Sequence, residues 1–119
     1  MPRDLAAELR GTSRCDYGAH IFERDQYKCV YCGFDGTSFT NWLQLTVDHI
    51  RRTGSRADEA DDNKVTCCPT CNSMTANVKE LKELSKDLPR DEYFKRKRGY
   101  IQKSRQAFFK FWHQEVARP

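Results

Sequence analysis

The sequence predicts a small α+β domain in which two strands and several helices are held together by a metal ion. Its 119 residues, 38% of them hydrophobic, suffice for one small core. Six cysteines, which include two C-x-x-C pairs, are many for a chain of this size. A strand–loop–strand pattern lies between the pairs, and a helical pattern follows the second. We therefore expect one domain, 1–119, stabilised by metal binding.

Composition narrows the class of protein. No stretch approaches the ~18 consecutive apolar residues of a membrane span, and Met1-Pro2-Arg3-Asp4 opens no apolar signal region. We therefore expect a cytoplasmic protein without membrane contact. Thiols stay reduced in the cytoplasm, so the cysteines indicate metal binding rather than disulfides.

Charge is distributed unevenly along the chain. Residues 1–89 hold 12 Lys/Arg and 14 Asp/Glu (net −2), whereas residues 90–119 hold 9 and 3 (net +6), which gives the total of +4. A basic segment on a mildly acidic body predicts an anionic partner such as nucleic acid. The alternative is a charged helix that only faces solvent.

The N-terminal part predicts helices and then a strand. Asp4 to Arg10 reads as a short helix and Ala19 to Asp25 as another, within an N-terminal helical extension, 1–23. The stretch from Gly33 to Thr40 is rich in turn residues. A half-buried strand then ends at Asp48-His49. Its alternating apolar residues are Leu43, Leu45 and Val47.

The second half predicts one more strand and two helices. The polar stretch 51–62 is a loop, and Lys64 to Cys67 is a short strand. Pro69 suits a first helical turn, and Pro89 ends that helix. Leucines recur within it at near-helical spacing, at positions 81, 84 and 88.

A long helix from Arg90 to Val116 carries the basic charge, within a C-terminal helical segment, 79–119. Its predicted apolar stripe, expected to pack on the body, is Phe94, Ile101, Phe108 and Trp112. Its predicted basic side, expected to face outward, is Arg96, Lys103 and Lys110. Arg105 falls on the apolar stripe, so either its stem snorkels or Gly99 divides the helix.

The paired cysteines predict a structural zinc site. Cys29 and Cys32 form one C-x-x-C pair, and Cys68 and Cys71 form another, with 35 residues between Cys32 and Cys68. Four thiolates complete a tetrahedral sphere and leave no open position for catalysis. Cys67 is an alternative to Cys68, and Cys15 is interpreted as a buried or free thiol.

Polar residues gather around this framework. Asp48-His49 ends the first strand, Asn63 precedes the second, and Asn72 follows Cys71 at the start of a helix. A zinc ion that joins the two cysteine pairs would bring these residues to one end of a ββ-α unit.

This ordered set resembles the HNH endonucleases of the cysteine-containing type. The matching segments are Arg24-Asp25-Gln26-Tyr27-Lys28-Cys29-Val30-Tyr31-Cys32-Gly33, Val47-Asp48-His49-Ile50, Asn63-Lys64-Val65 and Cys68-Pro69-Thr70-Cys71-Asn72. The resemblance implies a ββα-metal (His-Me finger) core at 24–78. It also implies DNA, most often double-stranded, as the substrate, with 5′-phosphate and 3′-hydroxyl product ends. A bacterial or phage gene is the origin that the resemblance implies.

The resemblance also implies a role for each polar residue. His49 would be the general base that activates water, and Asp48 the preceding metal ligand. Asn63 would prop the loop and orient the histidine, and Asn72 would complete the metal site of an H-N-N variant. A carboxylate and an amide oxygen suit Mg²⁺ or Mn²⁺, and an imidazole is a competent base at neutral pH.

Two departures from the family pattern leave a rival open. Thr75 stands where a lysine or arginine is common, and the loop after Asp48-His49 lacks the usual proline and paired glycines. Arg51, Arg52 and Arg56 in that loop are candidates to replace the lost charge. The rival is a catalytically inactive, zinc-stapled nucleic-acid-binding module, and a third option is a protein-interaction module. The acidic run 58–62 is interpreted as a solvated loop rather than a second metal site.

Overall fold

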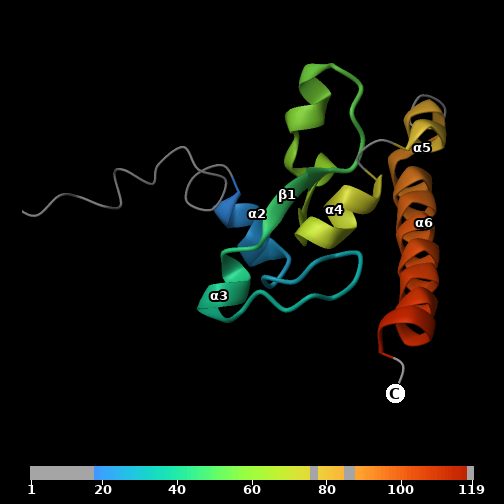
Figure 1. Cartoon of the computed structure of the whole chain (residues 1–119). Helices are drawn as coiled ribbons and strands as arrows, with labels where there is room; N and C mark the ends of the chain where they lie inside the picture. Colours follow the sequence, from blue (N-terminus) through green and yellow to red (C-terminus); the bar gives the residue numbers. More distant parts are fainter. Residues whose placement is uncertain (1–17, 76–77, 85–87, 118–119) are drawn as a thin grey trace, which may run out of the picture.

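The computed structural model describes residues 18–75, 78–84 and 88–117. The helix expected at Asp4 to Arg10, and Cys15, lie outside these residues. The chain forms two strands and several helices, whose arrangement in space is shown in Figure 1. The elements are α2 (Ala19–Arg24), α3 (Phe39–Trp42), β1 (Thr46–His49), η2 (Arg56–Glu59), η3 (Asp61–Asn63), β2 (Lys64–Cys67), α4 (Pro69–Thr75), α5 (Lys79–Leu84), α6 (Arg90–Phe111) and η4 (Trp112–Val116). The predicted small α+β fold is confirmed.

The sheet has two antiparallel strands, β1 and β2, whose register places Asp48 opposite Val65 and His49 opposite Lys64. Directly paired residues lie on the same face of a sheet, and successive residues lie on opposite faces. Asp48 and His49 therefore project to opposite faces of the sheet, although they are adjacent in the chain.

The outer edge of β2 is covered by the chain that surrounds α2. The Asp25 carboxylate accepts a hydrogen bond from the Thr66 backbone N–H at 2.8 Å, and Arg24 donates to the Lys64 carbonyl at 2.6 Å. The Val30 N–H donates to the Thr66 carbonyl at 3.1 Å. These bonds satisfy backbone groups that an edge strand would otherwise expose.

The first strand is shorter than its alternation predicted. It begins at Thr46 rather than near Leu43, because α3 forms just before it. Ser38 caps this helical turn by accepting the Asn41 N–H, and the backbone N–H of Leu45 is still bonded to Trp42. Leu45 is nevertheless fully buried.

The helical stretch predicted from Pro69 to Pro89 is two helices, α4 and α5. The last helix is continuous through Gly99 and passes into the π-helical turn η4, so Gly99 does not divide it. Figure 1 shows α6 as a long rod alongside α4.

The buried side of α6 differs from the predicted stripe. Tyr93, Lys97 and Ile101 are buried at four-residue intervals, and Arg105, partly buried, follows at the same interval. Phe108 and Trp112 are instead 64% and 47% exposed, so the prediction that they pack on the body is wrong.

The reason lies in what faces each level of the helix. Seven-residue spacing puts Phe108 on the same side as Ile101. At the level of Phe108 and Trp112, however, Thr70 and Met74 of α4 lie opposite across an open apolar groove. The rings therefore line this groove rather than a closed core.

The core surrounds the cysteines. Tyr31, Ile50, Val65, Leu81 and Ile101 are buried in one cluster with the cysteine side chains. Among the described helices, none combines the length and apolar character needed to cross a membrane.

Replacing Gly99 with alanine should stabilise the protein. A Cβ at Gly99 would meet no atom within 4 Å, and alanine in a helix interior is favoured over glycine by roughly 0.5–1 kcal/mol. Chemical denaturation should show this increase in the free energy of unfolding. Gly33→Ala is the matched control and should destabilise, because Gly33 has a φ of 79°. A Gly99→Ala variant of lower stability would contradict the helical environment described for this residue.

Candidate metal centre and polar site

Four cysteines form a cluster that fits a metal ion. The Sγ atoms of Cys29, Cys32, Cys68 and Cys71 all lie within 4.8 Å of one another. A tetrahedral zinc site with Zn–S bonds of about 2.3 Å requires sulfur atoms about 3.8 Å apart. The Cys32 and Cys68 sulfurs are 3.7 Å apart. Both the ligand type and the spacing therefore fit a structural zinc site.

Each pair of cysteines is shaped by a local turn. After Cys32, the Gly33 N–H donates to the Cys29 carbonyl at 2.8 Å, and Gly33 adopts a positive φ that favours glycine. The second pair starts α4, where the Cys71 N–H points to the Cys68 sulfur at 3.4 Å. We call the turn at 29–33 the knuckle; the knuckle and the first turn of α4 thus lie opposite each other across the cysteine cluster.

Cys67 lies beside the cluster and has a separate role. It is fully buried, and its thiol donates to the Cys68 carbonyl at 3.3 Å. The Cys67 side chain beside Cys29 lowers the pKa of Cys29 to about 4. The contact with Cys29, together with burial, raises the pKa of Cys67 well above its ordinary range. Cys67 is therefore a neutral thiol that supports Cys29, and the cluster contains Cys68 as the spacing predicted.

Arg105 of α6 contacts the same sulfurs. Its Nε donates to Cys71 Sγ at 3.3 Å and its terminal nitrogen to Cys68 Sγ at 3.5 Å. Burial opposes the charged guanidinium, but the bond to Cys71 and the charges of the nearby cysteine sulfurs together outweigh it and raise the pKa of Arg105. A cation here offsets the excess negative charge of four thiolates around a divalent ion. The contact with the cysteine sulfurs explains why a cation, Arg105, occurs on the predicted apolar stripe of this helix.

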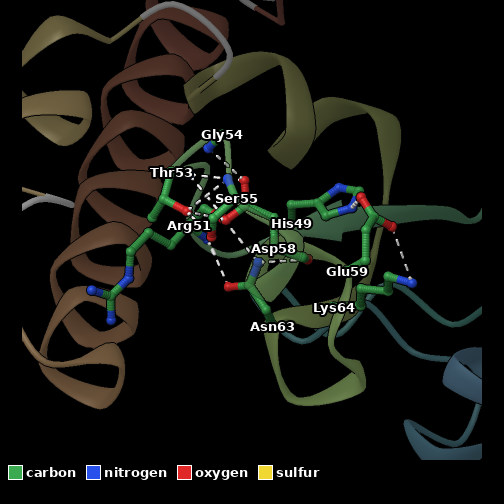
Figure 2. A network of polar contacts seen from close by, with 9 residues as sticks. All are labelled: His49, Arg51, Thr53, Gly54, Ser55, Asp58, Glu59, Asn63 and Lys64. Carbon is green, nitrogen blue, oxygen red and sulfur yellow. Dashed lines mark hydrogen bonds and ion pairs between the residues drawn. The ribbon is translucent and has the colours of Figure 1, made fainter.

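His49 lies in a polar network at the end of β1 (Figure 2). Its Nε2 is 3.1 Å from the Glu59 carboxylate, which is also 3.3 Å from the Lys64 ammonium. Lys64 is the cross-strand partner of His49, and Glu59 ends η2. The acidic run predicted to be a solvated loop thus supplies one carboxylate to the histidine. Sequence reasoning missed Glu59 because it lies ten positions further along the chain, in a polar loop.

Asn63 braces the loop that follows β1 (Figure 2). Its Oδ1 accepts the Arg51 N–H at 3.0 Å, and its Nδ2 donates to the carbonyls of Arg51 and Asp58 at 2.8 and 2.9 Å. The side chain is buried, so these bonds satisfy its polar atoms. Asn63 therefore joins the two ends of the loop directly.

Asp58 shapes the tip of this loop. Its carboxylate accepts hydrogen bonds from the Thr53 hydroxyl and from the backbone N–H groups of Thr53 and Gly54, at 2.6 to 3.0 Å. The Thr53 bonds lower the pKa of Asp58. Hydrogen bonds from its own side chains therefore stabilise the loop. They fix the position of the Glu59 backbone, from which the side chain contacts His49.

Asp48 lies on the other face of the sheet and is only 7% exposed. Its Oδ2 accepts the Tyr31 hydroxyl at 2.7 Å and the Lys97 ammonium at 2.8 Å. Burial and the nearby carboxylate raise the pKa of Tyr31, so the phenol remains a donor. Sequence reasoning missed Lys97, although its four-residue spacing from Ile101 is visible in the sequence.

The two predicted metal ligands offer donors that Mg²⁺ accepts, a carboxylate and an amide oxygen. The described contacts of the Asp48 carboxylate are with Tyr31 and Lys97, so the fit is one of donor type and of the positive charge that Asp48 already holds. Asn72 lies half-buried on α4, where its backbone N–H donates to the Cys68 carbonyl at 3.1 Å.

The basic residues divide into two surfaces. Arg52 and Arg56 are exposed on the loop after β1, whereas Arg51 is partly buried with its guanidinium 6.0 Å from the Tyr93 ring centre. Arg96, Lys103 and Lys110 are all exposed along α6, on the side predicted to face outward.

Comparison with known proteins supports the resemblance. Residues 29–77 match the family model described as HNH endonuclease. The match includes the cysteine cluster, both strands and α4, and it ends before α6. A search of curated proteins and a search of solved structures found no match.

Cys68→Ser should release zinc and largely unfold the protein, because the free energy of metal binding contributes to folding. Cys67→Ser is the matched control: it removes a neighbouring buried thiol and should keep one zinc per chain. Zinc content by elemental analysis and thermal unfolding measure both. A Cys68→Ser protein that keeps its zinc and its melting temperature would transfer the ligand position to Cys67.

Arg105→Met should weaken zinc binding by roughly 10–100-fold, because partners that hydrogen-bond to metal ligands typically contribute this much affinity. Competition with a chromogenic chelator would measure the change. Lys103→Met, a loss of charge on the exposed side of α6, is the control and should leave zinc affinity unchanged. Equal affinities in the two variants would show that Arg105 does not stabilise the thiolates.

Proposed function

Taking the match of residues 29–77 to the HNH endonucleases as the premise, we propose that this protein is a metal-dependent endonuclease that hydrolyses phosphodiester bonds in double-stranded DNA. The observation that carries the proposal is the His49 imidazole, held beside Glu59 next to a loop that Asn63 braces. An imidazole in a fixed position is the base that such hydrolysis requires.

In the proposed reaction, His49 takes a proton from a water molecule, whose oxygen attacks phosphorus. The bond from phosphorus to the 3′-oxygen breaks, and the departing oxygen takes a proton from solvent, which leaves 5′-phosphate and 3′-hydroxyl ends. The Glu59 carboxylate, 3.1 Å from Nε2, stabilises the imidazolium formed by the proton transfer. Asp48 and Asn72 are the residues that would hold Mg²⁺ or Mn²⁺, which would stabilise charge on the departing oxygen. Because Asp48 and His49 project to opposite faces of the sheet, one phosphate could meet both only at the end of β1.

DNA would contact two basic surfaces. Arg51, Arg52 and Arg56 lie in the chain that follows His49 and form one surface, and the exposed cations of α6 form the other. Contacts with phosphates position DNA without reading its sequence. The reduced thiols of the cluster are compatible with the proposed cytoplasmic location.

A catalytically inactive nucleic-acid-binding module is the second candidate. The observation that favours it is the Lys97–Asp48 ion pair, which occupies the carboxylate proposed to bind metal. Thr75, which stands where the family often has a basic residue, also favours the inactive module. Nicking of supercoiled plasmid with and without added Mg²⁺, using zinc-loaded protein, separates the candidates because the inactive module leaves the plasmid intact in both conditions.

His49→Ala should reduce plasmid cleavage by about 10²–10⁴-fold, the typical contribution of a general base, while DNA affinity stays near that of the parent. His113→Ala, which removes an exposed histidine of η4, is the matched control and should cleave normally. Undiminished cleavage by the His49→Ala protein would contradict the assigned base.

Replacing Arg96, Lys103 and Lys110 together by Gln should weaken binding on all DNA sequences alike. Each phosphate contact adds about 0.9 to the salt slope on duplex DNA, so the slope should fall by up to about 3 units. A Lys28→Gln/Lys79→Gln variant, which removes two exposed charges outside α6, is the control. A triple variant with the parent's affinity and slope would assign DNA contact to the loop arginines instead.

A further inference from the structure

The Lys97 ammonium is bound in a site built from oxygen atoms. It is contributed by α6, and the residue is only 5% exposed. Its Nζ lies 2.8 Å from Asp48 Oδ2, 3.2 Å from the His49 carbonyl and 3.3 Å from the Ile50 carbonyl. An ammonium has three N–H donors, and here three oxygens accept them. The end of β1 therefore binds a cation that belongs to the chain itself.

The same carboxylate is the one proposed to bind the divalent ion. Oδ2 of Asp48 accepts both Lys97 and the Tyr31 hydroxyl, so it already has two donors. An ion bound to this carboxylate would lie close to the ammonium in a site with little solvent, where like charges repel strongly. Both cations cannot be held by Asp48 at low cost.

The lysine stem permits an exchange. Lysine carries its charge at the end of four flexible carbons, and its neighbours Arg96 and Arg98 are exposed to solvent. Removing the ammonium without a replacement would leave the buried Asp48 charge unpaired, which is unfavourable. A divalent ion at the same carboxylate is such a replacement.

From this geometry we propose that Lys97 is a built-in competitor for the divalent ion: the ion binds Asp48 only as the ammonium withdraws. This inference rests on the proposed function, because it takes Asp48 as the metal ligand. It also assigns a regulatory role to α6, which lies outside the matched segment. By reciprocity, ion binding must expel Lys97 as strongly as Lys97 opposes the ion.

The first experiment measures Mn²⁺ affinity of zinc-loaded protein without DNA, by electron paramagnetic resonance. Lys97→Met removes the charge but keeps an apolar stem, and should tighten Mn²⁺ binding by about tenfold or more, within the usual range for coupled sites. Lys97→Arg keeps the positive charge, so its affinity for Mn²⁺ should stay as weak as that of the parent. Lys95→Met, an exposed charge on the same helix, should match the parent, and Asp48→Asn should lose the site.

The second experiment uses the parent protein, so it does not depend on the folding of a variant. Amine acylation followed by peptide mass spectrometry reports the accessibility of each lysine. Lys97 should be protected without Mn²⁺ and become labelled as Mn²⁺ is added, whereas the exposed Lys95 should label equally throughout.

The outcomes separate this inference from the function on which it rests. Asp48-dependent Mn²⁺ binding with unchanged Lys97 protection, and no gain in a folded Lys97→Met protein, would overturn the competition but leave the metal site standing. If neither the parent nor a folded Lys97→Met protein binds Mn²⁺ through Asp48, the proposed catalytic metal fails and the competition fails with it. Tighter binding in Lys97→Met together with Mn²⁺-dependent labelling supports both.

Discussion

The four-thiolate cluster is the constraint on which the rest of the structure depends. Cys29 and Cys32 come from a knuckle, and Cys68 and Cys71 begin α4, so an ion at this point joins segments far apart in the sequence. Four converging thiolates repel one another unless a cation lies between them. With a small apolar core around the cysteines, metal binding supplies folding free energy that hydrophobic burial alone would not.

The polar site inherits its geometry from this cluster. Tyr31, inside the first cysteine pair, reaches Asp48 on β1, and α6 reaches the sulfurs through Arg105 and the carboxylate through Lys97. The cluster, the strand end and the last helix are therefore one connected unit. Loss of the ion would disturb Asp48 through Tyr31 and through the position of α6, although neither Asp48 nor Tyr31 is a ligand of the zinc.

The features that depend on short-range sequence patterns were predictable from the sequence. The contacts between side chains far apart in the sequence were not. The C-x-x-C spacing predicted the cluster, and the bounds of β2 follow from a run of strand-forming residues between a polar loop and the helix that begins at Pro69. The inward cations of α6 were missed because lysine and arginine usually face solvent. Lys97 and Arg105 are buried only because Asp48 and the sulfurs lie opposite them. Their four-residue spacing with Ile101 was the available signal.

The most direct test of this account is X-ray absorption at the zinc edge of the purified protein. The structure predicts one zinc per chain with four sulfur neighbours at about 2.3 Å, the distance typical of thiolate ligands. The spectrum should contain no nitrogen or oxygen in the first coordination sphere, because the cluster consists of cysteines alone. Protein that folds without zinc, or zinc with fewer than four sulfur ligands, would contradict the central role of the cluster.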